Sequence, residues 1–207
     1  MYGRATRIQT SPEAIDKGIA FFKEKVAPKA SATPGNAGAV LLVDRKAGVA
    51  IGVTMWETTA ALNASEQFGM TSRTQSTAEI GGSVVDVDRF EQVIADRAQP
   101  PKAGVFVRLN TVAGSPEKLD AVIGFMQKQL PVIRALKGYR SLIMNVNRLS
   151  GRSTVSTGWD TMADLEASEA KASGLRREAA AIAGATSDVR VEIFELAFVE
   201  IKQATRV

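Results

Sequence analysis

The stretch Trp56–Glu57–Thr58 is followed closely by Leu62–Asn63–Ala64–Ser65–Glu66, and both return 103 positions later as Trp159–Asp160–Thr161 and Leu165–Glu166–Ala167–Ser168–Glu169. Matches in the same order lie towards both ends of the chain: Ser11–Pro12–Glu13 with Ser115–Pro116–Glu117, and Val87–Asp88–Arg89–Phe90–Glu91 with Val191–Glu192–Ile193–Phe194–Glu195. Two copies of so long a period indicate a duplicated domain and not a solenoid. The 207 residues therefore predict two repeats, 1–97 and 105–207, joined by a linker at 98–104 that contains two prolines and a glycine.

Each repeat shows the same series of predicted elements. Strands are expected at 2–9, 39–45, 49–56 and 84–94 in the first repeat, and at 105–112, 139–148, 152–159 and 188–201 in the second. A helix follows each first strand, capped by Ser11 or Ser115 with proline at the first helical position. Thr58 and Thr161 cap the next helices. The pattern is β-α-β-β-α-β, which predicts an α+β fold of two ferredoxin-like units.

The duplication has a physical reason. A four-stranded sheet with helices on one face leaves its other face bare, and two such sheets can cover each other. The sequence therefore predicts that the two units form an intramolecular dimeric α/β barrel, either as a monomeric pseudo-dimer or within a homodimer.

Composition excludes several kinds of chemistry. The chain has no histidine and no cysteine, so a Ser-His-Asp or Cys-His pair, a thiolate and a His-ligated metal are excluded, and no metal or other cofactor is expected. The net charge of +4 is dispersed, which argues against a nucleic-acid partner. Apolar runs such as Ala39–Val43 are too short to cross a membrane. A cytoplasmic protein is the expectation.

The run from Gly138–Tyr139–Arg140 to Trp159–Asp160–Thr161, closed by Leu165–Glu166–Ala167–Ser168–Glu169, resembles the dimeric α/β-barrel superfamily, and within it the antibiotic-biosynthesis-monooxygenase-like domains. Both repeats carry the resemblance. It implies the fold and a small-molecule ligand, with cofactor-independent oxygenation of an aromatic substrate among the possible activities. The haem-degrading branch has a tryptophan in the helix where this chain has Ser65 and Ser168, and it needs a histidine ligand, so haem degradation is not expected.

Comparison of the repeats suggests where a ligand binds. On the hairpin face expected to point away from the helices, the first repeat is apolar, whereas the second carries Ile143, Asn145, Arg152, Thr154, Ser156 and Gly158. Alternation in the other strands of the second repeat places Arg108, Asn110, Glu192 and Phe194 on the same face. The predicted substrate-binding residues, on a face that looks into the space between the sheets, are Arg108, Asn110, Asn145, Arg152, Thr154, Ser156 and Phe194.

Two functions compete. In the first, the protein is a cofactor-independent monooxygenase that acts on a small aromatic substrate, with Arg108, Asn110 and Asn145 holding an oxyanion and Tyr139 or Glu192 moving protons. In the second, it is a non-catalytic ligand-binding or stress-associated protein that binds a small apolar or aromatic molecule.

Simpler explanations stand beside the site hypothesis. In one explanation, the polar face is simply a solvated surface. In another, Arg108 and Glu192 form only a cross-strand ion pair. Arg4 and Arg108 recur in both repeats and are explained equally by symmetric structural contacts. Trp56 and Trp159 are expected in the core.

Overall fold

The computed structural model describes residues 1–185 and 187–202. The first repeat contains β1 (Tyr2–Gln9), α1 (Ile15–Phe21), α2 (Ala27–Ala32), β2 (Asn36–Asp44), β3 (Val49–Trp56), α3 (Thr59–Ala64), α4 (Glu66–Ile80) and β4 (Ser83–Arg97). The second contains β5 (Phe106–Ala113), α5 (Leu119–Arg134), β6 (Tyr139–Val146), β7 (Arg152–Trp159), α6 (Met162–Ala167), α7 (Glu169–Ala183) and β8 (Arg190–Ile201). A π-helical turn, Phe22–Val26, joins α1 to α2, whereas α5 is continuous.

Local signals explain the boundaries. Gly48 and Gly151 close the two hairpins with φ of 67° and 74°, a left-handed conformation that glycine adopts at little cost. The Thr58 and Thr161 side chains accept from the backbone N–H of Ala61 and of Asp164, as expected of helix caps. The serine caps are a correction. Ser11 and Ser115 precede short 3₁₀ turns and make no capping hydrogen bond, and the Ser115 hydroxyl donates to Glu117 instead.

Hydrogen bonding orders the strands β1-β3-β2-β8-β5-β7-β6-β4, the order of a closed antiparallel barrel. The predicted α+β class with two ferredoxin-like units is confirmed, and one chain supplies both units of a pseudo-dimer. The chain divides into two compact units, called unit 1 and unit 2 below. Unit 1 contains the strands β1, β3 and β2, and unit 2 contains β5, β7 and β6.

The units do not follow the repeats, because each repeat gives half of its last strand to the other unit. Unit 2 includes Phe90–Pro101, so the second half of β4 pairs there with β6. Unit 1 includes the chain from Glu195 on, so the second half of β8 pairs there with β2. The repeats are thus joined by strand exchange as well as by the linker at 98–104.

Both exchanged strands form the same arrangement of ion pairs. In unit 1, Arg45 at the hairpin turn donates from Nε to Glu195 of β8 (2.8 Å) and from Nη1 to Asp16 of α1 (2.6 Å). In unit 2, Arg148 donates in the same way to Glu91 of β4 (2.6 Å) and Asp120 of α5 (3.0 Å). This arrangement accounts for the recurrence of Glu91 and Glu195 in the sequence.

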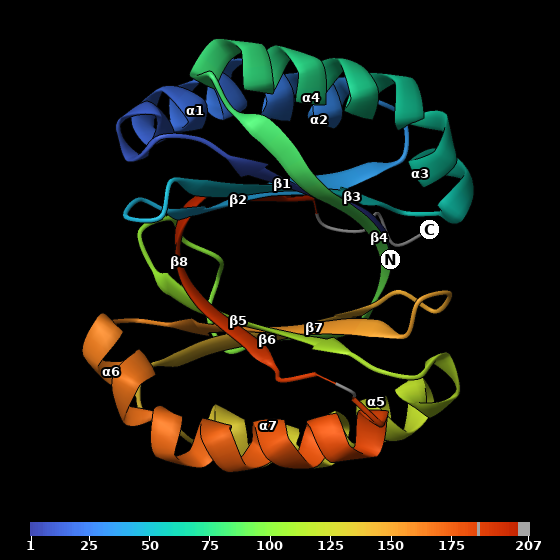
Figure 1. Cartoon of the computed structure of the whole chain (residues 1–207), viewed down its shortest axis with the longest axis vertical. Helices are drawn as coiled ribbons and strands as arrows, with labels where there is room; N and C mark the ends of the chain where they lie inside the picture. The colour runs from blue at the N-terminus through green and yellow to red at the C-terminus, as the bar shows by residue number, and fades with distance from the viewer. Residues whose placement is uncertain (186, 203–207) are drawn as a thin grey trace. The chain divides into compact units, whose positions relative to one another are not determined.

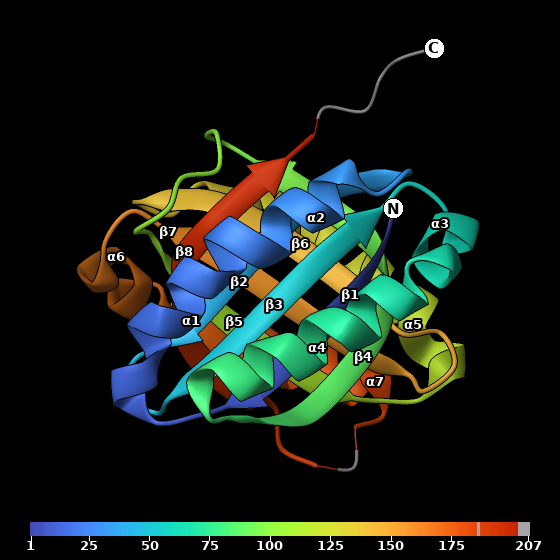
Figure 2. The ribbon, with the colours of Figure 1, turned by 90° about the horizontal axis from the view of Figure 1, so that it is seen from above.

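Helices cover one face of the sheet in each unit (Figure 1). In unit 1, α1 and α4 run side by side across β1, β3 and β2 (Figure 2). In unit 2, α5 and α7 pack together, and their apolar side chains meet Leu142, Met144 and Val146 of β6. Trp56 and Trp159 are 0% and 1% exposed, so the prediction of two core tryptophans is confirmed. In the described part of the chain, no helix has the length and apolar character that a membrane crossing requires.

Candidate functional site

A buried arginine joins the sheet of unit 2 to its helices. Arg108 of β5 is 2% exposed, and it donates from Nη1 to Ser168 Oγ (2.7 Å) and from Nη2 to the Leu165 carbonyl (2.6 Å). Its Nη2 also lies 3.1 Å from the Glu169 carboxylate at the start of α7. Burial lowers the Arg108 pKa, and Glu169 opposes that effect. The guanidinium is thus held rigidly at the junction of α6 and α7.

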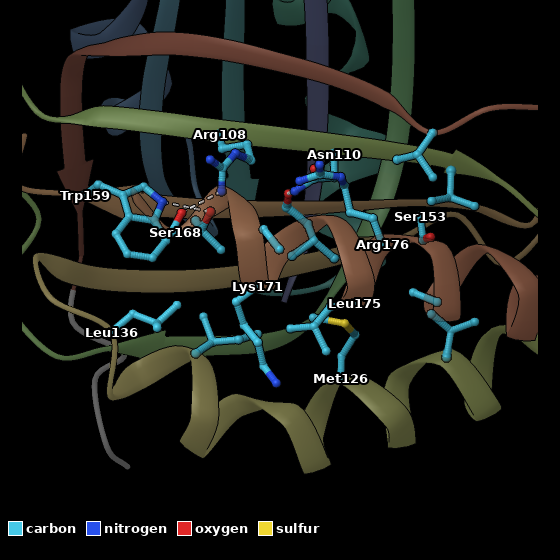
Figure 3. Close-up of a pocket in the computed structure, with 18 residues that line it drawn as sticks. Arg108, Asn110, Met126, Leu136, Ser153, Trp159, Ser168, Lys171, Leu175 and Arg176 are labelled. Carbon is cyan, nitrogen blue, oxygen red and sulfur yellow. Dashed lines mark hydrogen bonds between the residues drawn. The ribbon is translucent and has the colours of Figure 1, made fainter. Parts of the chain in front are cut away.

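A cavity opens beside this arginine, between the sheet and the helices α5 and α7 (Figure 3). Its volume is about 60 Å³, several times the roughly 10–15 Å³ that one water molecule needs. Most of its wall is apolar and includes Val122, Met126, Ile133, Leu136, Val155, Trp159, Leu175 and Ala179. The cationic lining residues are Arg108, Lys171 and Arg176. The lining, apolar with a few convergent polar groups, is that of a small-molecule site, although the volume is below the roughly 300–1,000 Å³ of pockets for drug-sized ligands.

Asn110 gives this pocket an unused acceptor. Its Nδ2 donates to the Val155 carbonyl (3.2 Å), which fixes the orientation of the amide. Its Oδ1 is buried and has no partner among the described residues. A buried acceptor without a donor costs about 1–3 kcal/mol. A ligand hydroxyl or N–H in the pocket would remove that cost.

Unit 1 repeats the buried arginine. Arg4 of β1 is 3% exposed and donates to Ser65 Oγ (3.1 Å), the Leu62 carbonyl (3.1 Å) and Glu66 (2.8 Å). Glu66 also accepts from Arg73 (2.9 Å) and from Arg89. Arg4 and Arg108 therefore make corresponding contacts in the two units, each with a serine hydroxyl and a leucine carbonyl.

Glu66 provides a test by pH. Hydrogen bonds from Arg73 and Arg89 lower the pKa of Glu66 to about 2. This pKa lies below the value of about 4.3 for an unfolded chain. The ionised carboxylate therefore stabilises the folded state when the pH is above about 4.3, and this contribution is lost as the pH falls towards 2. The stability difference between wild type and Glu66→Gln is therefore expected to be largest above pH 5 and to shrink between pH 5 and pH 2. Urea unfolding at a series of pH values measures it.

The control for this test is Glu57→Gln, which removes an exposed carboxylate directly after β3. Its difference from wild type should change much less over this pH range. Parallel stability curves for wild type and Glu66→Gln would contradict the assignment of acid sensitivity to Glu66.

The structure corrects the expected face of Arg108 and Asn110. Both line the pocket on the helix side of the sheet, so they lie on the opposite face from Asn145. Asn110 pairs in register with Val155, which also lines the pocket. The physical reason is that the buried Arg108 guanidinium needs hydrogen-bond acceptors, and the Leu165 carbonyl at the end of α6 and the Ser168 hydroxyl supply them on the helix side of the sheet.

On the other face of unit 2, the predicted polar residues do gather. Asn145 and Thr154 lie opposite each other in the sheet, with Thr111 next to Thr154 and Gln92 next to Asn145. The four side chains form a row across β5, β7, β6 and β4. The Asn145 Oδ1 and Thr111 Oγ1 atoms are buried without a partner among the described residues. Ligand binding by Asn145, Thr154 and Ser156 stays a prediction.

The remaining predicted residues do not line the pocket beside Arg108. The Tyr139 hydroxyl donates to Asp96 (2.7 Å), and burial raises its pKa well above the usual value. Glu192 pairs with Arg190 on its own strand (3.0 Å), and not with Arg108. Phe194 is buried, and Arg152 pairs with Ala113 at one end of β7. Catalytic roles for Tyr139 and Glu192 stay predictions.

Several residues at the two buried arginines were missed. They are Arg73 and Gly69 in unit 1 and Lys171, Ala172 and Arg176 in unit 2. The signal was present in the repeat, since Arg4, Ser65 and Glu66 return together as Arg108, Ser168 and Glu169. When a strand arginine and its helix partners both recur in the second repeat, they indicate that the arginine lies on the face of the strand that points to the helices.

The chain has the fold of the antibiotic-biosynthesis-monooxygenase-like proteins in the dimeric α/β-barrel superfamily. It is similar over its whole length to an anthrone oxidase-like protein, with a TM-score of 0.68, 11% identity and 97% of that chain covered. Over 95% of each chain it is similar to a ferredoxin-fold protein from Listeria monocytogenes related to antibiotic biosynthesis monooxygenases, with a TM-score of 0.55 and 9% identity. At these identities the likeness concerns the fold alone.

A closer relationship is found in sequence. The chain is 31% identical over 203 residues to the uncharacterised protein Rv2557 of Mycobacterium tuberculosis, which covers 98% of this chain and 90% of the relative. The chain belongs to the same family as this mycobacterial protein. No family model matches the sequence.

Proposed function

We propose that the protein binds a small aromatic molecule bearing a hydroxyl group in the pocket between the sheet and the helices of unit 2. The observation that carries the proposal is the unpaired Asn110 Oδ1 in a largely apolar cavity. A phenol fits this chemistry because its ring buries apolar surface and its hydroxyl donates to Asn110. Binding is the primary function in this proposal.

Trp159 allows the proposal to be tested directly, because it lines the pocket and is one of only two tryptophans. In the Trp56→Phe variant, Trp159 gives the single indole N–H signal in a proton–nitrogen NMR spectrum. Titration with 4-ethylphenol is expected to shift this signal. Binding of ethylbenzene, which has the same shape without the hydroxyl, is expected to be about tenfold weaker. Asn110→Val should remove the difference.

Two matched variants locate the ligand. Ala179→Met fills the pocket of unit 2 with a flexible apolar side chain and is expected to abolish the shift. Ser76→Met makes the same change at the corresponding position of unit 1 and should leave the titration unchanged. Circular dichroism establishes that both variants fold. Equal binding of the two ligands, or an unchanged titration in Ala179→Met, would contradict the proposal.

A cofactor-independent monooxygenase is the second candidate, and the cationic lining favours it. Arg108, Lys171 and Arg176 would stabilise the anion of a bound phenol, and such an anion is electron-rich enough to react with oxygen. In a reaction of this kind, the substrate supplies the electrons, one oxygen atom enters it and the other leaves as water. An anthrone oxidase-like protein shares the fold.

Oxygen consumption with anthrone separates the two candidates. An oxygenase should consume one O2 molecule for each anthraquinone formed, and it should do so faster than the reaction without protein. Ala179→Met should remove this excess rate. If 4-ethylphenol binds but anthrone oxidation is no faster than without protein, only the binding function remains.

A further inference from the structure

The corresponding pocket of unit 1 has different chemistry. It lies between the sheet and the helices α1 and α4 and has a volume of about 70 Å³. Phe21, Phe22 and Phe68 contribute aromatic surface, and Arg4 and Arg73 lie at its polar end. The π-helical turn Phe22–Val26, absent from the continuous α5 of unit 2, supplies Phe22 to the wall.

Two cationic donors in this pocket are unused. The Nε of Arg4 and the Nη1 of Arg73 are both buried and have no hydrogen-bond partner among the described residues. Arg4 itself is 3% exposed. Buried N–H groups are almost always paired in native structures, so two orphaned guanidinium donors in one pocket indicate a missing acceptor.

Gly69 lets both arginines come close to the backbone of α4. A Cβ atom built on Gly69 would lie 2.7 Å from Arg4 Nη1 and 3.2 Å from Arg73 Nη1. The corresponding position in unit 2 is Ala172, whose methyl group is part of the pocket wall. The absence of a side chain in α4 therefore lets both guanidinium groups approach a common point in unit 1.

The cations around the two pockets are arranged differently. In unit 1 a single carboxylate, Glu66, accepts from three arginines, Arg4, Arg73 and Arg89. In unit 2, Glu169 pairs with Arg108 and Arg176, and Ile193 occupies the position that corresponds to Arg89. Arg176 donates to Glu169 from both Nη1 and Nη2. The third cation at the unit 2 pocket is Lys171, at the position of Phe68 in unit 1, so the two pockets have the same net charge and differ in where the cations lie.

We propose that the pocket of unit 1 binds the carboxylate of a small aromatic acid, with its oxygens accepting from Arg4 Nε and Arg73 Nη1. The ring lies against Phe21, Phe22 and Phe68. The inference rests on the proposed function, since both concern small-molecule binding between sheet and helices, and it assigns a separate ligand class to the second pocket. One chain then holds two unlike sites, a site for a phenol and a site for a carboxylate.

Benzoate and benzamide form the test pair, because they share shape and size and differ in charge. Isothermal titration of the full chain is expected to show benzoate binding at least tenfold more tightly than benzamide. Gly69→Ala places a methyl group against the Arg4 and Arg73 guanidinium groups, which displaces them from the proposed carboxylate site and should reduce benzoate affinity at least tenfold. Alanine is favoured over glycine inside a helix, and the methyl group meets the far end of the flexible Arg4 side chain, which has to move aside, so circular dichroism is used to establish that the variant folds. The matched control is Ala172→Gly, which changes the corresponding residue of unit 2 and should leave benzoate binding unchanged.

Arg89→Gln separates general charge from direct contact. It removes one positive charge that touches Glu66 and does not line the pocket, so it should weaken benzoate binding less than Gly69→Ala does. Equal affinities for benzoate and benzamide, no binding of benzoate, or benzoate binding that is insensitive to Gly69→Ala would each overturn the inference. The phenol titration at Trp159 is a separate measurement. If 4-ethylphenol binds and benzoate does not, the anion site is refuted and the phenol site is not.

Discussion

Residues 1–97, expressed without the second repeat, are expected not to form a stable monomer. In the whole chain, the second half of β8 pairs with Gly38–Val43 of β2, and the isolated repeat would leave that strand as an open edge. Leu41 and Val43 are 4% and 1% exposed beside it. The repeat would also lose Phe198, which packs edge-on against Phe22 with ring centroids 5.6 Å apart. An open apolar edge pairs with other chains.

The matched control restores the missing strand. A chain that joins residues 1–89 to 195–202 through a flexible linker contains the parts of unit 1 in a single polypeptide, and it should be monomeric with cooperative unfolding. Residues 1–97 mixed with 98–207 should form a one-to-one complex by strand exchange. Sedimentation velocity and urea unfolding measure both outcomes. A monomer of 1–97 as stable as the whole chain would show that the exchanged strand is dispensable.

Trp159→Ala is expected to lower the free energy of unfolding by about 3–5 kcal/mol, the usual cost of removing a large aromatic side chain from a core. Trp159 is 1% exposed and packs edge-on against Tyr139 with ring centroids 6.1 Å apart. Its indole N–H donates to Thr157 Oγ1 (3.0 Å). The truncation would therefore leave a void between β7 and the helices.

Trp159→Phe separates packing from hydrogen bonding. It keeps a ring against Tyr139 and loses the indole N–H, so its cost should be about 1–2 kcal/mol, set by the unpaired Thr157 hydroxyl and the smaller ring. Chemical denaturation with matched baselines measures both variants. A loss below 1 kcal/mol for Trp159→Ala would show that Trp159 does not support the core of unit 2.

The architecture could be predicted because the repeat contains the same local signals twice. Thr58 and Thr161 cap helices, Gly48 and Gly151 close hairpins, and both sets are found where the sequence placed them. These features depend on a few neighbouring residues, so they can be read from one chain. Strand exchange depends on which distant edge the end of β4 or β8 pairs with, and no local signal encodes that choice.

The site was harder to predict because alternation in a strand defines two faces without saying which one meets the helices. Arg108 was placed with Asn145 since polar residues on a sheet are usually directed away from a core. Instead Arg108 reaches the helix carbonyl of Leu165 and is buried by it. The asymmetry between the pockets was also missed, because it depends on Gly69, which has no Cβ atom and so lets the two arginines approach the helix.

Strand exchange has a consequence for biosynthesis. The ribosome makes unit 1 first, yet this unit takes its last strand from Glu195–Ile201, close to the end of the chain. The unit that begins the protein is therefore the last to be completed, and during translation its β2 edge must wait for nearly the whole polypeptide to emerge. A nascent chain arrested before β8 should remain sensitive to protease at β2 and should gain protection only after release.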